Sequence, residues 1–390
     1  MIILCEPQCV GFEHREVNSA LIAVISEAFP GEELLFLAEE SHLEQVRDQL
    51  ERHGVAITCR AITVPERSLS SVRRYSGDSA LVGNVFETCE ELGADKVVFC
   101  SITSPLVIAI KRLLPGYPQI RCLAVPHGLL RDISRPPVRP AEIPFWFRFW
   151  FSHFNNDRLQ FLVYGQPILD DLVSVLPHMS RYASALDHPY FYQPAGDEMH
   201  AFGDVVKFGF FGVVHRGKGA DAMYRLAEDI ARAGLGDRSL FTLIGYLNDK
   251  RLDHLLNSRL NIPSAYKPLD REAFSAYAKE IDYSIFLYRP SSYRLTASGA
   301  FFDALSYVKP VITLKNPFFE HYFNRFGDIG YLCSTYAEVR DCVTEVIRSK
   351  PEDRYTEQCR NILAAREEMG IPQLAGRFRT LAATAFQNEL

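Results

Sequence analysis

The sequence has no strong excess of one charge and no closely spaced cysteine pair. Its 390 residues carry 42 lysines and arginines against 48 aspartates and glutamates, a formal net charge of −6. This balance argues against a protein that works chiefly by binding nucleic acid through a broad basic face, and it leaves local basic sites open. The nine cysteines form no Cys-x-x-Cys pair and several lie in apolar runs. That pattern is typical of buried free thiols in a reducing compartment.

Motifs for a bound cofactor or metal are also missing. The chain contains neither Gly-x-Gly-x-x-Gly nor Gly-x4-Gly-Lys-Ser/Thr, no Asp-x-Asp, and no His/Cys cluster at metal-ligand spacing. We therefore expect no cofactor and no metal. The sequence begins Met-Ile-Ile-Leu-Cys-Glu, without a basic region followed by a long apolar segment. This beginning predicts no signal peptide, so we expect a cytoplasmic protein.

The chain alternates short apolar runs with amphipathic segments. In the first half, runs such as 34–37, 55–64 and 96–100 are predicted strands, and 41–53 is a predicted helix that opens on Ser41 and closes at a glycine. Strands separated by helices of this length form parallel sheets through right-handed crossovers. The first half is therefore predicted to be a Rossmann-like, doubly wound α/β domain.

The alternation restarts in the second half, where 249–260 is one of the predicted helices. We predict an α/β fold with two Rossmann-like domains, 1–190 and 203–372, joined by a linker over 187–204. The last helix, about 373–390, is expected to pack back on the first domain. Two such domains place the carboxyl ends of their strands across a central cleft, which is where ligands of open α/β sheets bind.

The stretch from Val206 to Gly219 reads as a buried strand that breaks into a glycine-rich, basic turn, and a helical pattern follows at once. Gly212 and Gly219 therefore lie between a strand end and a helix start, with Arg216 and Lys218 beside them. Such a junction presents unpaired amides and the positive end of a helix dipole. The turn is either a phosphate or diphosphate site or an ordinary turn with two solvated cations.

The second half resembles the retaining, nucleotide-sugar-dependent glycosyltransferases of family 4, which have the GT-B fold. Gly212 followed by Lys218-Gly219 is similar to the family's diphosphate turn, and Val213 stands where the family has an arginine. Arg216 is the residue that could replace this arginine. The resemblance implies that Lys218 and Arg216 contact the donor diphosphate.

A second segment of the resemblance runs from Arg289 to Ile312. In the family, two glutamates eight positions apart contact the donor sugar and the ribose. Asp303 stands at the second position, and Leu295 at the first. Ser298 and Gly299 open the helix between them, where their amides suit a phosphate, and Arg294 adds charge. The alternative for Asp303 is a surface helical carboxylate.

The loop Tyr266-Lys267-Pro268 is similar to the segment that holds the nucleotide base in the family, although Tyr266 can equally be a packed aromatic. In the first half the resemblance is in outline only. His127 follows the strand 119–125, as does the family's histidine that contacts the donor sugar; its alternative is a structural histidine.

The loop after the first strand contains Gly11, Glu13 and His14. In this fold such a loop closes over the phosphates or the acceptor. If the enzyme inverts configuration it needs a protein base, and Glu13 or His14 is the first candidate. If it retains configuration, the donor phosphate can take the acceptor's proton.

The segment 143–154 contains both tryptophans of the chain, and four arginines lie in it or shortly before it (131, 135, 139 and 148). Aromatic and basic residues together suit a membrane interface. The segment is nevertheless apolar on nearly all sides, as a buried helix would be. Both interpretations stay open, and with them a location at the inner face of a membrane.

Together these features predict a metal-independent glycosyltransferase. It would move a sugar from a nucleotide donor, a UDP- or GDP-sugar, to a glycan or lipid-linked acceptor in the synthesis of cell-surface polysaccharides or glycoconjugates. Two alternatives stay open. A nucleotide-sugar 2-epimerase of the same fold would use the same diphosphate site, and a non-catalytic nucleotide-binding protein would explain Leu295.

Overall fold

The computed structural model describes residues 1–66, 68–194, 202–257, 259–289 and 295–386. The chain divides into two compact units. The first unit contains Met1–Phe191, Leu295–Ala297 and Met369–Leu390, and the second contains Tyr192–Arg294 and Ser298–Glu368.

Over the described residues, the first unit has a parallel sheet in the order β3-β2-β1-β4-β5-β6-β7. The two strands β1 and β2 are buried at every position, as expected for parallel strands covered on both faces. The strands are β1 Ile2–Cys5, β2 Leu34–Ala38, β3 Thr58–Ala61, β4 Lys96–Phe99, β5 Arg121–Ala124, β6 Leu159–Tyr164 and β7 Ala183–Leu186.

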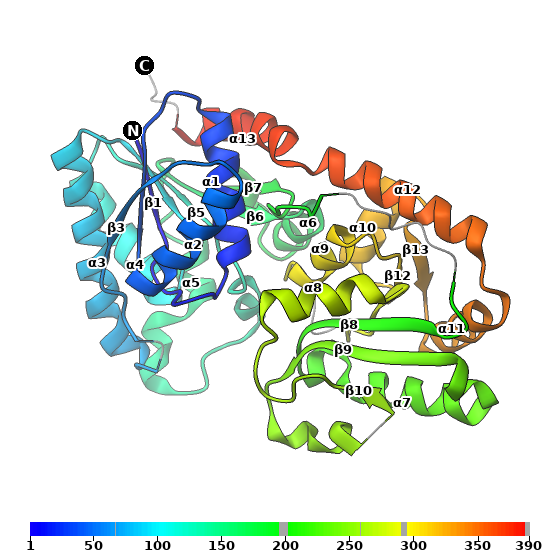
Figure 1. The fold of residues 1–390 in the computed structure, drawn as a ribbon. Coiled ribbons are helices and arrows are strands. Elements are labelled where there is room, and N and C mark those ends of the chain that lie inside the picture. Colours follow the sequence, from blue (N-terminus) through cyan, green and yellow to red (C-terminus); the bar gives the residue numbers. More distant parts are fainter. Residues whose placement is uncertain (67, 195–201, 258, 290–294, 387–390) are drawn as a thin grey trace. The chain divides into compact units, whose positions relative to one another are not determined.

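Helices cover both faces of this sheet (Figure 1). One core lies under α1 (Arg15–Ala28), α2 (Glu40–Arg52) and α13 (Ile371–Phe386). The other lies under the remaining helices of the unit, which are α3 Ser71–Leu92, α4 Ser104–Leu113, α5 Phe147–Ser152 and α6 Gln166–Val175.

Helix α13 comes from the end of the chain and packs on α1. Phe378 is fully buried in the core shared with α1, and its ring lies 6.2 Å from that of Phe29. The guanidinium of Arg379 donates to the carbonyl of Ala28 at 2.8 Å, which satisfies an acceptor at the end of α1. The first unit is thus built from both ends of the sequence.

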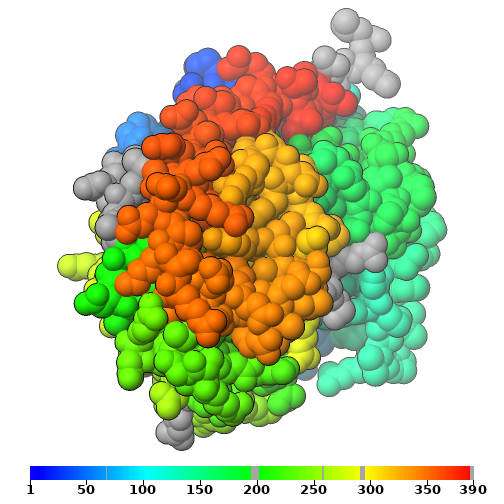
Figure 2. Space-filling model, turned by 90° about the vertical axis from the view of Figure 1, so that its right-hand side faces the viewer, coloured from blue at the N-terminus to red at the C-terminus, as the bar shows by residue number. Residues whose placement is uncertain are grey.

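The second unit has a parallel sheet in the order β10-β9-β8-β11-β12-β13. Its described strands are β8 Val206–Val214, β9 Ser239–Leu247, β10 Leu260–Asn261, β11 Tyr283–Phe286, β12 Val311–Leu314 and β13 Gly330–Cys333. Its described helices are α7 Ala220–Ile230, α8 Arg271–Glu280, α9 Gly299–Ser306, α10 Pro317–Phe326, α11 Tyr336–Ser349 and α12 Glu352–Glu368. Helices α11 and α12 form part of the surface of this unit (orange in Figure 2).

The predicted fold class, α/β with two Rossmann-like parallel sheets, is confirmed. Two predicted elements differ. The strand expected over 55–64 is only Thr58–Ala61, because it is the exposed edge of the sheet. The helix expected over 249–260 is a 3-10 helix, Lys250–Asn257, preceded by a turn in which the Asp249 carboxylate accepts the amide of Arg251 at 2.9 Å.

The aromatic segment 143–154 is neither fully buried nor fully exposed. Phe147 and Phe151 pack into the core of the first unit, whereas Ile143, Phe149 and Phe154 face solvent. The buried-helix interpretation therefore holds for one face of α5 only. Among the described residues, no helix combines the length and the apolar character needed to cross a membrane.

Candidate functional site

The glycine-rich turn after β8 lies at the carboxyl edge of the second sheet. Gly212 has φ +84°, and a Cβ there would lie 3.1 Å from the Nζ of Lys218. Gly219 has φ +80°, and a Cβ there would lie 2.1 Å from the carbonyl oxygen of Leu287. Both positions favour glycine because of their conformation, and Gly219 needs it also for space, since the atom that a Cβ would meet belongs to the backbone. As a result, the Lys218 ammonium lies against the end of β8, and α7 begins against the end of β11.

Lys218 is a poorly solvated cation. Burial lowers its pKa to about 8, and the negative charge of Asp303 opposes this shift. The ammonium lies 5.8 Å from the centre of the Tyr288 ring. Among the described residues, no carboxylate forms an ion pair with it within 4.0 Å. A cation with little water and no close counter-ion is suited to receive an anion.

Helix α9 begins next to this lysine, since a Cβ on Gly212 would lie 3.6 Å from that of Ala300. Ser298 caps the helix by accepting the amide of Phe301 at 3.3 Å, and its hydroxyl also bonds that of Tyr288 at 2.9 Å. The Ser298 hydroxyl is thus already engaged. Gly299 is exposed, and a Cβ there would meet no atom within 4 Å, which leaves room for a ligand at the first turn of α9.

The structure places Arg216 differently from Lys218. Arg216 is exposed, and its charge acts on Asp249, whose pKa is lowered chiefly by hydrogen bonds from Arg251. Arg294 lies outside the described residues. Of the two cations in the turn, Lys218 is therefore the one that the fold directs at the strand ends.

The loop predicted to hold the base lies beside the carboxyl end of β9, where the amide of Leu247 donates to the carbonyl of Ala265 at 2.7 Å. Tyr266 is exposed and its hydroxyl donates to the carboxylate of Asp253. Lys267 and Pro268 are exposed next to it. The ring of Tyr266 is therefore not a packed core aromatic.

Asp303 and Leu295, which stand at the family's two glutamate positions, have different environments. Asp303 is half-buried on α9, and its charge reaches Lys218. Leu295 is 6% exposed, has φ +59°, and belongs to the core of the first unit. A left-handed conformation is uncommon for a branched residue and marks a constrained position.

In the first unit, three imidazoles gather after the carboxyl ends of β1, β5 and β7. The ring of His14 meets that of His127 edge-on at 4.7 Å, and His188 lies 5.7 Å from His127. Burial lowers the pKa of His127 well below its usual range, with smaller effects of His14 and His188, and lowers that of His188 to about 4. His127 and His188 are therefore neutral at pH 7, so His127 can act as a hydrogen-bonding group rather than as a cation.

The loop that carries His14 is held in place by side chains that the sequence analysis missed. Gly11 has φ +56°; its amide donates to the hydroxyl of Ser41 at 2.9 Å, and its carbonyl lies 2.7 Å from the Nδ1 of His42. His14 itself has φ +52° and directly precedes α1, with Glu13 half-buried before it. The fixed loop suggests a functional position for His14, because strained residues tend to persist at such sites.

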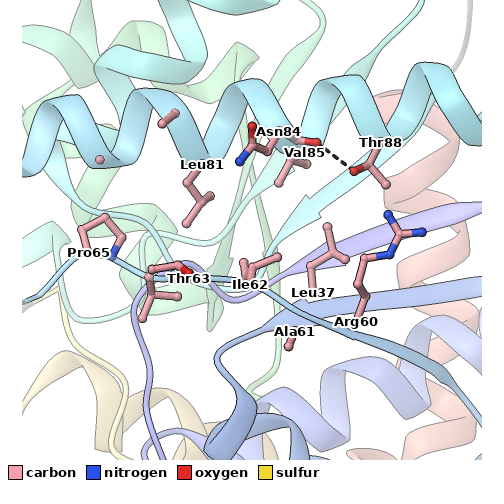
Figure 3. A pocket seen from close by; sticks show the side chains of 13 residues that line it. Leu37, Arg60, Ala61, Ile62, Thr63, Pro65, Leu81, Asn84, Val85 and Thr88 are labelled. Carbon is pink, nitrogen blue, oxygen red and sulfur yellow. Dashed lines mark hydrogen bonds between the residues drawn. The ribbon is translucent and has the colours of Figure 1, made fainter.

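A hollow of about 440 Å³ lies between α3 and the segment after β3 (Figure 3). Leu37, Ile62, Leu81 and Val85 line its apolar part, and Arg60 lies at one end. None of the residues predicted for the site belongs to its lining. This hollow is therefore separate from the candidate donor and histidine sites.

No protein-family model matches the sequence, and no curated protein matches it. Solved structures do match. HepE of Anabaena in complex with UDP aligns with a TM-score of 0.66 at 12% identity, over 98% of this chain and all of that one. WaaG, a glycosyltransferase involved in lipopolysaccharide biosynthesis, aligns with 0.63 at 11% identity, over 98% and 99%. The fold is of the GT-B type.

A third GT-B neighbour is MnaA of S. aureus, solved with UDP, with a TM-score of 0.53 at 14% identity over 98% of this chain and 95% of that one. The three structural alignments cover both units. The sequence motifs shared with glycosyltransferase family 4, by contrast, were specific only in the second unit. At such identities they establish the fold, and the activity has to be argued from the residues of the site.

Proposed function

We propose that this GT-B protein is a glycosyltransferase that takes its sugar from a nucleoside-diphosphate donor. The observation that carries the proposal is the half-buried Lys218 ammonium, which lies against Gly212 and beside the start of α9 and, among the described residues, has no ion pair with a carboxylate. The neighbours add support, because HepE was solved with UDP and glucose and WaaG is a glycosyltransferase.

The proposed chemistry is electrostatic. As the glycosidic bond breaks, negative charge develops on the leaving diphosphate, and Lys218 and the first amides of α7 and α9 stabilise it more strongly than in the ground state. Arg216 contributes from the exposed side of the turn. Asp303 is assigned to the nucleotide ribose, and Tyr266, Lys267 and Pro268 to the base.

The first unit is assigned to the acceptor, a glycan or lipid-linked glycan, and the second to the donor. His127, neutral at pH 7, would hydrogen-bond the donor sugar. His14 and Glu13 are the side chains to test as a base if the sugar's configuration inverts. With Leu295 in place of the family's first glutamate, the sugar loses one carboxylate contact, so a chain that binds nucleotide without turning it over is the second candidate.

A panel of nucleotides tests the proposal. We expect one nucleoside diphosphate among UDP, GDP, ADP and dTDP to raise the melting temperature, and its sugar conjugate to be consumed only when an acceptor glycan is present. Binding without turnover would favour the non-catalytic candidate, and sugar conversion without acceptor would favour an epimerase. If none of the nucleotides bound, the donor-site assignment would be wrong.

We also propose that the first unit contacts an anionic membrane surface through the aromatic and basic segment 131–154. Val138, Ile143 and Phe154 are more than half exposed there. Arg131, Arg135 and Arg139 are exposed in the same segment. Exposed apolar side chains beside arginines suit the boundary between acyl chains and anionic headgroups.

Vesicle flotation tests this contact. The protein should float with vesicles that contain anionic lipid and stay behind with zwitterionic ones, and added salt should weaken the binding. Each arginine near the surface contributes about 1 kcal/mol, so replacing one by serine should weaken partitioning roughly fivefold. Phe154→Ser should reduce binding, whereas Phe12→Ser, an equally exposed phenylalanine elsewhere in the unit, should not. Equal binding of the two variants would refute the assigned surface.

A further inference from the structure

A carboxylate, a thiol and an imidazole meet after the carboxyl end of β1. Glu6, Cys9 and His14 each offer one ligand atom, and these atoms lie within 4.8 Å of one another. The Sγ of Cys9 is 3.4 Å from the Nδ1 of His14. Glu6 and Cys9 are fully buried, and His14 is half-buried. The cluster is thus an enclosed group of three different donor types.

Within the described residues, the Glu6 carboxyl group has only neutral hydrogen-bond donors around it. Its Oε1 accepts from the amides of Gln8 and Cys9 at 3.1 and 3.2 Å and from the Ser101 hydroxyl at 2.5 Å, and its Oε2 accepts from the Asn18 amide at 3.0 Å. These donors are neutral. No lysine or arginine in the described part of the chain forms an ion pair with Glu6. A buried carboxyl group that accepts four hydrogen bonds and has no close cationic partner is a site where a metal cation would add the missing positive charge.

We propose that Glu6, Cys9 and His14 bind one divalent transition-metal ion of the zinc type. In a tetrahedral zinc site, with bonds of about 2.3 Å to sulfur and about 2.1 Å to nitrogen, the two ligand atoms lie about 3.6 Å apart. The observed 3.4 Å is close to this separation. Thiolate and imidazole together favour zinc over magnesium or calcium, which prefer oxygen ligands.

The surroundings hold the ligands in orientation. The Asn18 amide that bonds Glu6 also lies 3.0 Å from the Nε2 of His42, and the Nδ1 of His42 lies 2.7 Å from the carbonyl of Gly11. Oriented neighbours of this kind typically support metal ligands. An ion here would neutralise Glu6 and clamp the loop that carries His14. Three protein ligands leave a fourth position open to water or to a ligand.

The expectation of no metal overlooked this cluster because Glu-x2-Cys-x4-His is not a familiar ligand spacing. A metal-bound His14 is not available as a base, so the inference gives this residue a different role from the one tested for an inverting enzyme. The inference does not depend on the nucleotide site, since the donor residues that carry that proposal lie in the second unit.

Cobalt binding tests the site directly. The purified protein is stripped with a chelator and titrated with Co²⁺ alone, and the near-ultraviolet thiolate-to-cobalt charge-transfer band is recorded. We expect the band to saturate at one equivalent and to disappear when Zn²⁺ displaces cobalt. Cys9→Ser should abolish the band. Glu6→Gln, which keeps the shape and removes the charge, should weaken cobalt binding at least about tenfold.

Matched controls separate this site from adventitious binding. Cys59→Ser and His178→Ala change the same residue types elsewhere in the unit and should leave the band unchanged. Circular dichroism confirms that each variant is folded; if Cys9→Ser is not, Glu6→Gln and His14→Ala decide the test. Absence of the band, an unchanged band in Cys9→Ser, or unsaturable binding of several equivalents would overturn the proposal.

Discussion

Lys218→Ala should abolish the stabilisation of the protein by nucleoside diphosphate and lower turnover by about 10² to 10³-fold, the loss expected when one preorganised group is removed from a developing negative charge. The side chain is half-buried, so its removal also takes away packing contacts. Lys218→Met keeps the apolar stem and removes only the ammonium; we expect the same loss of affinity with little change in the melting temperature of the free protein.

Lys207→Ala is the matched control, because Lys207 lies at the start of β8, the strand that leads into the turn with Lys218, and contacts Glu280 instead. It should bind nucleotide as the wild type does. Calorimetric titration of the three variants with the nucleotide from the panel measures this. Wild-type affinity in Lys218→Met would contradict the diphosphate role of Lys218.

The same lysine should make binding depend on pH. Burial lowers its pKa to about 8, so the free protein loses this charge as the pH rises through 8. A bound diphosphate favours the charged form and raises the pKa. Affinity should therefore be highest below pH 8 and fall by up to about tenfold per pH unit above it. Lys218→Met should lack this fall, and a fall of equal size in that variant would assign it to another group.

Gly219→Ala should destabilise the second unit severely. The residue has φ +80°, which alone costs an L-residue about 1–2 kcal/mol. The new methyl would also lie 2.1 Å from the carbonyl oxygen of Leu287, a backbone atom of the neighbouring strand end, so α7 and β11 would have to separate. We expect loss of several kcal/mol and loss of nucleotide binding.

Gly234→Ala is the control that separates the cost of the positive φ from the cost of the clash with Leu287. Gly234 has φ +75°, but a Cβ there meets no atom within 4 Å, so only the conformational cost of about 1–2 kcal/mol should be lost. Both tryptophans lie in the first unit, at 146 and 150. On heating Gly219→Ala, circular dichroism should show the second unit unfolding at a lower temperature than in the wild type. The tryptophan fluorescence, which reports the first unit, should stay native at that temperature. Similar losses in the two variants would show that the contact with Leu287 is unimportant.

The fold could be predicted because most of its strands and helices have a clear signal in their own stretch of sequence. β1 and β2 are continuous apolar runs, and the helices between strands carry a clear period, so the alternation was visible along the chain. β7 and β13 were missed because they are short and weakly apolar: three of the four residues of β7 are alanine or serine, and β13 begins with glycine. Short strands of this kind are fixed by their neighbours in the sheet and not by their own propensity.

The same distinction holds for the sites: those made of consecutive residues could be predicted, and those made of residues far apart in the sequence could not. The turn with Lys218 could be predicted because strand, glycines and helix are consecutive. Tyr288 was missed, because its contact with Ser298 depends on how β11 and α9 meet. The cluster around Glu6 was missed for a stronger reason: its partners Asn18 and Ser101 are 12 and 95 residues away, and no motif connects them.

Helix α13 follows the second unit in the sequence but belongs to the first, and this determines which unit can finish folding first during synthesis. The apolar side of α1 emerges early, but the side chains that cover it, Leu374, Phe378 and Ala382 among them, are made only after the second unit. Domains generally fold as they emerge, N-terminal first. Here the second unit is finished before the first, and a nascent chain carries an exposed apolar helix face through most of its synthesis. The sixteen residues of α13 therefore act as an intramolecular cover, and the first unit can be completed only after the whole second unit has been made.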